Sequence, residues 1–208
     1  MHIDTLPLST MDGLTLEADL VLPDHIVGAA VVCHPHPQYG GDRFNNVVDA
    51  LFRAFAGAGL ATVRFDFRGV NNSEGEHGGG VDERMDALAA IEAVEAYAGD
   101  GPLVLAGYSF GALVALDVAV PRIDGWLAVA PPLGMARSAP VAATDARPKL
   151  VLVPAYDQFS SPAAMPTAIA GWPGLTVETI ESADHFLAGR TAVVAERAVA
   201  FVSALAAR

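Results

Sequence analysis

Short apolar runs alternate with segments of helical periodicity along most of this chain. An apolar run between turn residues is typical of a strand, whereas apolar residues spaced three and four apart are typical of an amphipathic helix. Strands are predicted at 3–8, 14–22, 29–33, 60–67, 103–106, 125–130, 149–154 and 175–180. Helices are predicted at 44–58, 82–97, 112–116, 163–170 and 191–207. Strands that alternate with helices predict a mostly parallel sheet covered by helices on both faces.

Local signals refine several of these elements. The turn residues 11–13 predict a hairpin between the first two strands. Asp82 is a candidate N-cap for the second helix, and Asp66 and Arg68 are predicted to form a local ion pair. The predicted buried stripe of the second helix consists of Met85, Leu88, Ala89, Ile91, Val94 and Tyr97.

Composition narrows the class of protein. The chain has 208 residues, of which 52% are hydrophobic and 17% are charged, so we expect one compact domain over residues 1–208. The net charge of −12 argues against nucleic acid and against an anionic membrane surface as partners. A single cysteine, Cys33, excludes an intrachain disulfide, and no signal peptide or membrane-spanning segment is predicted. These features lead us to expect a cytoplasmic protein.

A serine between two glycines carries the strongest chemical signal. Residues 107–111, Gly-Tyr-Ser-Phe-Gly, lie where a predicted strand gives way to a predicted helix. A G-x-S-x-G sequence in that setting is a nucleophile elbow, which holds its serine hydroxyl exposed above the sheet on a strained turn. Ser109 is therefore the candidate nucleophile, and it requires a base and an orienting acid nearby.

An acid and a histidine follow Ser109 in suitable places. Asp157 comes just after the strand at 149–154, and His185 lies in the loop after the strand at 175–180. The carboxyl ends of parallel strands share one edge of a sheet, which is where open α/β sheets place their sites. The alternative acid Asp145 falls between predicted strands rather than just after one, and Asp184 is expected to be a solvated loop residue.

With these residues in view, the chain resembles a small, lidless member of the α/β-hydrolase superfamily, close to its dienelactone-hydrolase-like branch. The matching pieces lie in family order between residues 34 and 186. They are His34-Pro35-His36-Pro37 with Gly40-Gly41, Asp66-Phe67-Arg68-Gly69, the elbow at 107–111, Tyr156-Asp157, and Ala183-Asp184-His185-Phe186. One departure is that dienelactone hydrolases proper use a cysteine nucleophile, whereas position 109 is serine. The resemblance therefore implies a serine hydrolase that acts on esters, without implying that particular substrate.

The resemblance also implies roles for the residues of the site. Ser109 would attack an acyl carbonyl, His185 would accept and return its proton, and Asp157 would orient the imidazole. The oxyanion would be held by the backbone N–H of Phe110, the residue after the nucleophile, and by one from the proline-rich loop at 34–41. Pro35 and Pro37 have no N–H, which leaves His36, Gln38 and Tyr39 as donors. Alignment with the family motif favours His36.

Several of these residues also have alternative interpretations. His34 and His36 form a histidine pair, but no complementary Cys/His cluster accompanies them, so no metal site and no cofactor are predicted. Tyr39, Phe44, Phe159 and Phe186 are candidates either for an acyl pocket or for packing. Residues 131–148 are too few for a lid domain, so we expect an open site, which does not sterically exclude bulky or water-soluble esters. The expected substrates are small to medium carboxylic esters. The alternatives are a thioesterase, an amidase or an acyltransferase with the same triad, or a non-catalytic binding module on this scaffold.

Overall fold

The computed structural model describes residues 1–136, 138–160, 162–163 and 165–207. Within these residues, eight strands form one sheet in the order β1-β2-β4-β3-β5-β6-β7-β8. The strands are β1 (Asp4–Ser9), β2 (Thr15–Val21), β3 (Gly28–Cys33), β4 (Leu60–Phe65), β5 (Leu103–Tyr108), β6 (Gly125–Val129), β7 (Lys149–Pro154) and β8 (Leu175–Ile180). The helices are α1 (Asn46–Gly57), α2 (Glu83–Ala98), α3 (Phe110–Leu116), α4 (Met165–Ala168) and α5 (Thr191–Ala206), and three 3₁₀ turns are η1 (Pro37–Tyr39), η2 (Leu133–Met135) and η3 (Val141–Thr144).

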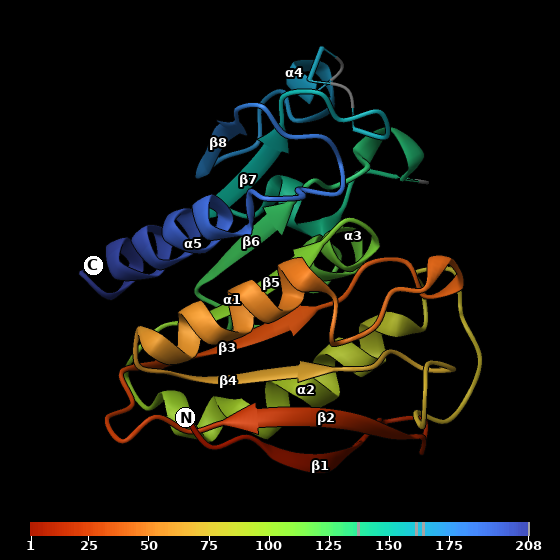
Figure 1. The fold of residues 1–208 in the computed structure, drawn as a ribbon, viewed down its shortest axis with the longest axis vertical. Helices are drawn as coiled ribbons and strands as arrows, with labels where there is room; N and C mark the ends of the chain where they lie inside the picture. The colour runs from red at the N-terminus through yellow and green to blue at the C-terminus, as the bar shows by residue number, and fades with distance from the viewer. Residues whose placement is uncertain (137, 161, 164, 208) are drawn as a thin grey trace.

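The sheet is mostly parallel, as predicted. β1 pairs antiparallel with β2, and β2 pairs antiparallel with β4. The remaining neighbours, from β4 through β3 to β8, are all parallel, so their carboxyl ends meet at one edge of the sheet (Figure 1). The predicted hairpin is confirmed, because the Gly13 N–H donates to the Thr10 carbonyl across the turn at 2.9 Å.

Helices cover both faces of the sheet. α1 and α5 lie side by side on one face, and α2 and α3 lie on the other (Figure 1). Strands β3, β4, β5, β6 and β7 are buried along their whole length, which explains why their sequences read as continuous apolar runs. Between β6 and β7 the described residues form η2 and η3 and no lid domain.

The predicted first and fourth helices are longer than the observed ones. α1 begins at Asn46, because the side chain of Asn45 accepts a hydrogen bond from the Val47 N–H and caps the helix there. Phe44, the first residue of the predicted helix, lies before α1, is 55% exposed and packs against the Arg43 guanidinium. α4 covers only part of the predicted 163–170, and residue 164 lies outside the described residues. No helix among the described residues is long and apolar enough to cross a bilayer.

The buried face of α2 differs from the predicted stripe. Tyr97 is exposed, Met85 and Leu88 are only partly buried, and Asp82 makes no capping hydrogen bond. The fully buried positions instead include two acids, Glu83 and Asp86. Alanines elsewhere on that face let the helix approach the sheet closely, while the two acids find polar partners in the loops at its edge.

Those partners also correct the predicted ion pair between Asp66 and Arg68. The Arg68 guanidinium binds Asp86 on α2 at 2.7 Å and Asp12 in the hairpin turn at 2.9 Å. Asp66 instead accepts from the Arg43 N–H at 2.8 Å and also pairs with the Arg43 guanidinium. Because β4 ends at Phe65, the two side chains diverge, and each anchors a different segment.

The buried pair of Arg68 and Asp86 gives a stability prediction. In Asp86→Ala the guanidinium keeps only Asp12 as a carboxylate partner, so we expect the free energy of unfolding in urea to fall by about 3–5 kcal/mol. Arg53→Ala is the control. It removes one of the two arginine partners of Asp49, the Arg53 side chain is 55% exposed, and the loss should be less than about 1 kcal/mol. A loss of similar size in the two variants would contradict a structural role for the buried pair.

Candidate active site

Ser109 occupies the sharp turn between β5 and α3. Its backbone has φ 54° and ψ −116°, a strained conformation for a residue with a side chain. A Cβ atom on Gly107 would lie 2.2 Å from the Gly111 carbonyl oxygen, and one on Gly111 would lie 2.4 Å from that of His34. Both glycines are therefore required by close backbone packing, and the predicted elbow geometry is present.

Ser109, His185 and Asp157 form a continuous hydrogen-bonded chain. Ser109 Oγ lies 2.8 Å from His185 Nε2, and His185 Nδ1 lies 2.8 Å from Asp157 Oδ2. The three residues come from the loops after β5, β8 and β7, which end at the same edge of the sheet (Figure 1). The structure thus brings together the three residues that the sequence singles out.

Asp157 is fixed by the turn in which it lies. Its Oδ1 accepts the backbone N–H groups of Phe159 and Ser160, both at 2.8 Å, which leaves Oδ2 for the imidazole. The Ser160 hydroxyl in turn donates to the Pro131 carbonyl after β6. These contacts hold the carboxylate in one orientation, as an acid that orients a histidine requires.

The His185 ring is positioned from several sides. The Tyr108 hydroxyl donates to the His185 carbonyl at 2.8 Å, which ties the base to the residue before the nucleophile. Phe159 packs edge-on against the imidazole at 4.8 Å between ring centroids, and Phe186 lies 5.9 Å away. Both phenylalanine rings remain about half exposed, so they border the mouth of the site rather than fill its core.

The nucleophile is less exposed than the sequence predicts. Ser109 retains only 9% of its accessible surface, and His185 and Asp157 retain 5% and 4%. The His185 imidazole lies against Ser109, and Phe159 packs on the imidazole. Partial burial lowers the local dielectric and strengthens the electrostatic interactions within the triad.

Two of the three candidate oxyanion donors in the proline-rich loop are already engaged. The Gln38 N–H donates to the His36 ring at 3.2 Å, and the Tyr39 N–H donates to the His36 carbonyl at 3.1 Å. This favours the His36 N–H as the donor from this loop. The ring of His36 packs against the ring of Phe110 with 4.9 Å between their centroids, so the side chains of the two residues that carry the predicted oxyanion donors are in contact.

Both ends of this loop are anchored to the residues that follow β4. At one end, His34 Nε2 accepts the Phe67 N–H at 3.0 Å, so Nδ1 carries the proton and donates to the Pro35 carbonyl at 2.6 Å. At the other end, Asp66 holds Arg43 through its backbone and its guanidinium. His34 therefore shapes the loop, and no group of three or more metal-ligating side chains occurs among the described residues.

The remaining candidates have other partners. Asp145 pairs with Arg147 at 2.6 Å, and this hydrogen bonding lowers the pKa of Asp145 to about 2. Asp184 accepts the Phe186 N–H within its own loop, as expected. Cys33 is fully buried, and burial raises the pKa of its thiol, so it is an unreactive core residue. Of the candidate pocket aromatics, Phe44 packs under two arginines, whereas Tyr39 is exposed beside His36.

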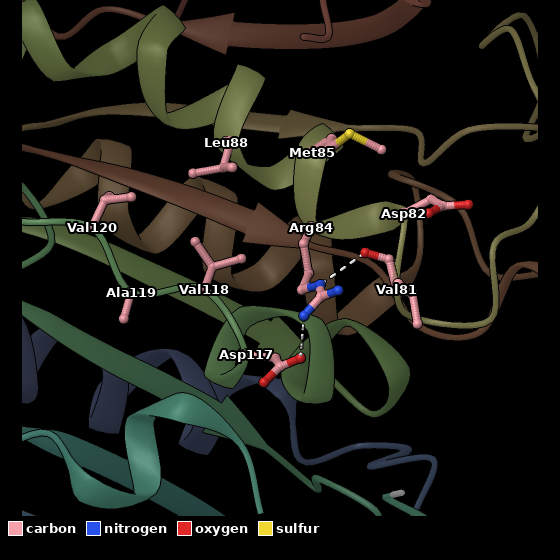
Figure 2. Close-up of a pocket in the computed structure, with 9 residues that line it drawn as sticks. All are labelled: Val81, Asp82, Arg84, Met85, Leu88, Asp117, Val118, Ala119 and Val120. Carbon is pink, nitrogen blue, oxygen red and sulfur yellow. Dashed lines mark hydrogen bonds and ion pairs between the residues drawn. The ribbon is translucent and has the colours of Figure 1, made fainter. Parts of the chain in front are cut away.

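A pocket of about 330 Å³ lies away from the triad, between the start of α2 and the segment that follows α3 (Figure 2). Its lining includes Leu88, Val120 and an ion pair of Arg84 and Asp117 at 3.1 Å. Figure 2 shows Arg84 bridging from the Val81 carbonyl to Asp117, so these polar groups are paired with one another. The pocket therefore offers no group to the chemistry at Ser109.

Sequence reasoning missed the residues that support the triad from outside it. Tyr108 and Ser160 act through a hydroxyl that bonds a distant carbonyl, and Glu83 and His77 meet across a loop beside Phe110. The only local signal was the position of Glu83 at the start of a helix after a glycine run. Partners separated by many residues leave no periodic pattern in a sequence.

A family model matches more than half of the chain. The family described as "Serine aminopeptidase, S33" matches residues 30–164, which include Ser109 and Asp157 and end before His185. The chain belongs to this family. An uncharacterized protein of Rickettsia prowazekii (strain Madrid E) is 36% identical over 107 residues, and that match covers only 45% of the Rickettsia protein.

Solved structures place the family member in the α/β-hydrolase superfamily. An α/β serine hydrolase homologue from Coxiella burnetii is 30% identical, with a TM-score of 0.85 over 95% of this chain and 96% of that one. An α/β serine hydrolase without a lid from Xanthomonas campestris is 29% identical, with a TM-score of 0.83 over 98% and 94% of the two chains. The protein is thus a member of the α/β-hydrolase superfamily, as the resemblance implied, and its described residues form no lid domain between β6 and β7.

The His34 anchor predicts a pH dependence of stability. Burial lowers the pKa of His34 to about 4, whereas an unfolded histidine titrates near 6.5. The unfolded chain therefore binds the additional proton, and the stability that neutral His34 contributes is complete above about pH 6.5 and is lost towards pH 4.

The test compares urea unfolding of wild type and His34→Gln at pH 7.5 and pH 4.5. The wild type should lose about 2–3 kcal/mol more than the variant between these pH values. His2→Gln, which changes an exposed histidine, should follow the wild type. An identical pH effect in wild type and His34→Gln would contradict the anchored neutral imidazole.

Proposed function

We propose that this hydrolase cleaves small to medium carboxylic esters through an acyl-enzyme intermediate on Ser109. The observation that carries the proposal is the unbroken chain from Ser109 Oγ through His185 to Asp157, with both links at 2.8 Å, at a strained elbow. A structural serine needs neither this backbone conformation nor an oriented imidazole. The proposal includes one catalytic domain over residues 1–208, a cytoplasmic location and a reaction without a cofactor.

The hydrogen bonds define the first half of the reaction. Because Asp157 accepts from Nδ1, the Nε2 lone pair of His185 faces Ser109 and takes its proton as Oγ attacks the ester carbonyl. Asp157 then stabilises the imidazolium. The imidazolium Nε2 then donates its proton to the leaving oxygen, and the alcohol departs as the acyl-enzyme forms.

The second half repeats these steps with water. Nε2 removes a proton from a water molecule, the hydroxide attacks the acyl carbon, and Ser109 leaves with the proton that His185 returns. The negative oxygen of each tetrahedral intermediate is held by the N–H groups of Phe110 and His36. Phe110 is the first residue of α3, so its N–H has no partner within the helix and the helix dipole adds to its effect.

The mouth of the site indicates the range of substrates. No lid is formed by the described residues between β6 and β7, and Phe159 and Phe186 present apolar surface beside the triad. An open site bordered by two rings suits water-soluble esters with a short or medium acyl group, so the proposed class is a carboxylesterase.

A second candidate activity is amide hydrolysis with the same triad. It is favoured by the description of the matching family as serine aminopeptidases. A thioesterase would use the same residues, because the leaving group alone changes. These activities differ from the non-catalytic alternative in that all of them require the Ser109 hydroxyl.

The test is hydrolysis of p-nitrophenyl esters from acetate to octanoate, together with an aminoacyl p-nitroanilide. Ser109→Ala should abolish turnover of every substrate, and Asp157→Asn should lower kcat by about 10⁴-fold because the imidazole takes the wrong tautomer. Ser203→Ala, which changes an exposed serine on α5, is the matched control and should keep wild-type activity.

The pattern across the panel separates the candidates. The proposal expects ester turnover that declines as the acyl chain lengthens. Faster release of nitroaniline than of nitrophenol would favour the amidase. Turnover that persists in Ser109→Ala would show that the reaction does not use the triad and would overturn the proposal.

A further inference from the structure

A buried carboxylate lies outside the triad, on the oxyanion side of the site. Glu83 is the first residue of α2, and its side chain has no exposed surface. One of its oxygens accepts the Gly78 N–H and the other accepts the Gly80 N–H, both at 2.8 Å. A buried carboxylate is costly unless it is paired. These contacts therefore fix residues 78–80, here called the glycine loop, against the start of α2.

The same carboxylate holds a histidine. His77 Nδ1 lies 2.7 Å from Glu83 Oε1, in a close contact that does not have the geometry of a hydrogen bond. The His77 side chain is only 16% exposed. The contact with Glu83 holds the ring at the edge of the site, and the glycine loop follows His77 directly in the chain.

The His77 ring contacts both residues that are proposed to hold the oxyanion. Its centroid lies 5.0 Å from the ring of His36 and 5.4 Å from the ring of Phe110. The His36 and Phe110 rings are themselves 4.9 Å apart. Each of the three rings therefore packs on the other two, and the His77 ring also contacts the buried Glu83 carboxylate.

The glycine loop adds a second restraint on Phe110. A Cβ atom on Gly80 would lie 3.5 Å from Phe110 Cε2, so the backbone of this loop passes in contact with the ring. Glu83 therefore restrains Phe110 through two routes, through the His77 ring and through the backbone at Gly80. His36 is restrained through His77 and through the anchored ends of its own loop.

From these contacts we infer that His77, held by Glu83, is a positioning residue that sets the spacing of the two oxyanion donors. The inference rests on the proposed function, because it assigns the N–H groups of Phe110 and His36 to the oxyanion. His77 itself touches neither the nucleophile nor the base in this arrangement. Its contribution is to keep two backbone donors, on different segments, at the separation that a tetrahedral intermediate requires.

The physical consequence is a defect in kcat rather than in KM. Oxyanion donors act on charge that develops in the transition state, and losing one donor costs about 10²–10³ in rate. Displacing donors by a fraction of an ångström is a milder form of that loss. Ground-state binding of an ester uses these donors little, so KM should change by no more than about threefold.

The experiment measures kcat and KM for p-nitrophenyl acetate in wild type, His77→Ala, His77→Phe and His25→Ala. In His77→Ala, kcat should fall by about 10- to 100-fold with a nearly unchanged KM. His77→Phe keeps a ring but loses the contact with Glu83, so its kcat should recover only in part and stay at least about threefold below wild type. His25 is an exposed histidine before β3, at the opposite edge of the sheet, and His25→Ala should match wild type in both constants.

A second readout does not depend on the choice of ester. The rate at which a fluorophosphonate labels Ser109 should fall in His77→Ala in parallel with kcat, and the thermal midpoint should match that of His77→Phe. If wild type labels and turns over but His77→Ala equals His25→Ala, the inference is overturned and the proposed function stands. If His77→Ala alters KM alone, or if His77→Phe matches wild type without the contact to Glu83, the positioning role of the anchored histidine is overturned as well. A wild-type Ser109 that does not label overturns the proposed function and the inference together.

Discussion

The close approach of three backbone segments at the elbow is the constraint on which the site depends. The end of β3, the end of β5 and the start of α3 approach so closely that neither Gly107 nor Gly111 has room for a Cβ atom. This packing forces Ser109 into its positive φ and turns its Oγ towards His185. It also brings the loop that begins at His34 beside the first N–H of α3. One steric arrangement thus sets both the nucleophile and the place where an oxyanion would form.

The two sides of the site are stabilised in different ways. On the acid–base side, Asp157 and His185 lie on loops after neighbouring strands, and short hydrogen bonds to Ser160 and Tyr108 fix them. On the oxyanion side, the restraint comes from buried charges, with Asp66 holding Arg43 and Glu83 holding the glycine loop. Buried polar groups cost stability unless they are fully paired, so their concentration beside Ser109 indicates that geometry there outweighs the cost.

The parts that could be predicted from the sequence are those with local signals. The elbow and Asp157 come just after apolar strands, and His185 lies in the loop after the alternating strand β8. A parallel sheet brings such positions to one edge. The predicted buried face of α2 was wrong. Hydrophobic periodicity counts Glu83 and Asp86 as polar, and it contains no information about Arg68 or the glycine loop as their partners. Phe44 was misplaced for a similar reason, since an arginine outside the helix provides its packing surface. These details depend on contacts between segments that are distant in the sequence. Such contacts are known only once the fold is known.

The most direct measurement is the site of covalent modification by a fluorophosphonate, mapped by mass spectrometry of peptides from wild type and His185→Ala. The account predicts a single adduct on Ser109 in the wild type and a labelling rate at least about 10³-fold lower without the imidazole. An adduct on another residue, or equal labelling of Ser109 in both proteins, would contradict the claim that His185 activates Ser109 as the nucleophile.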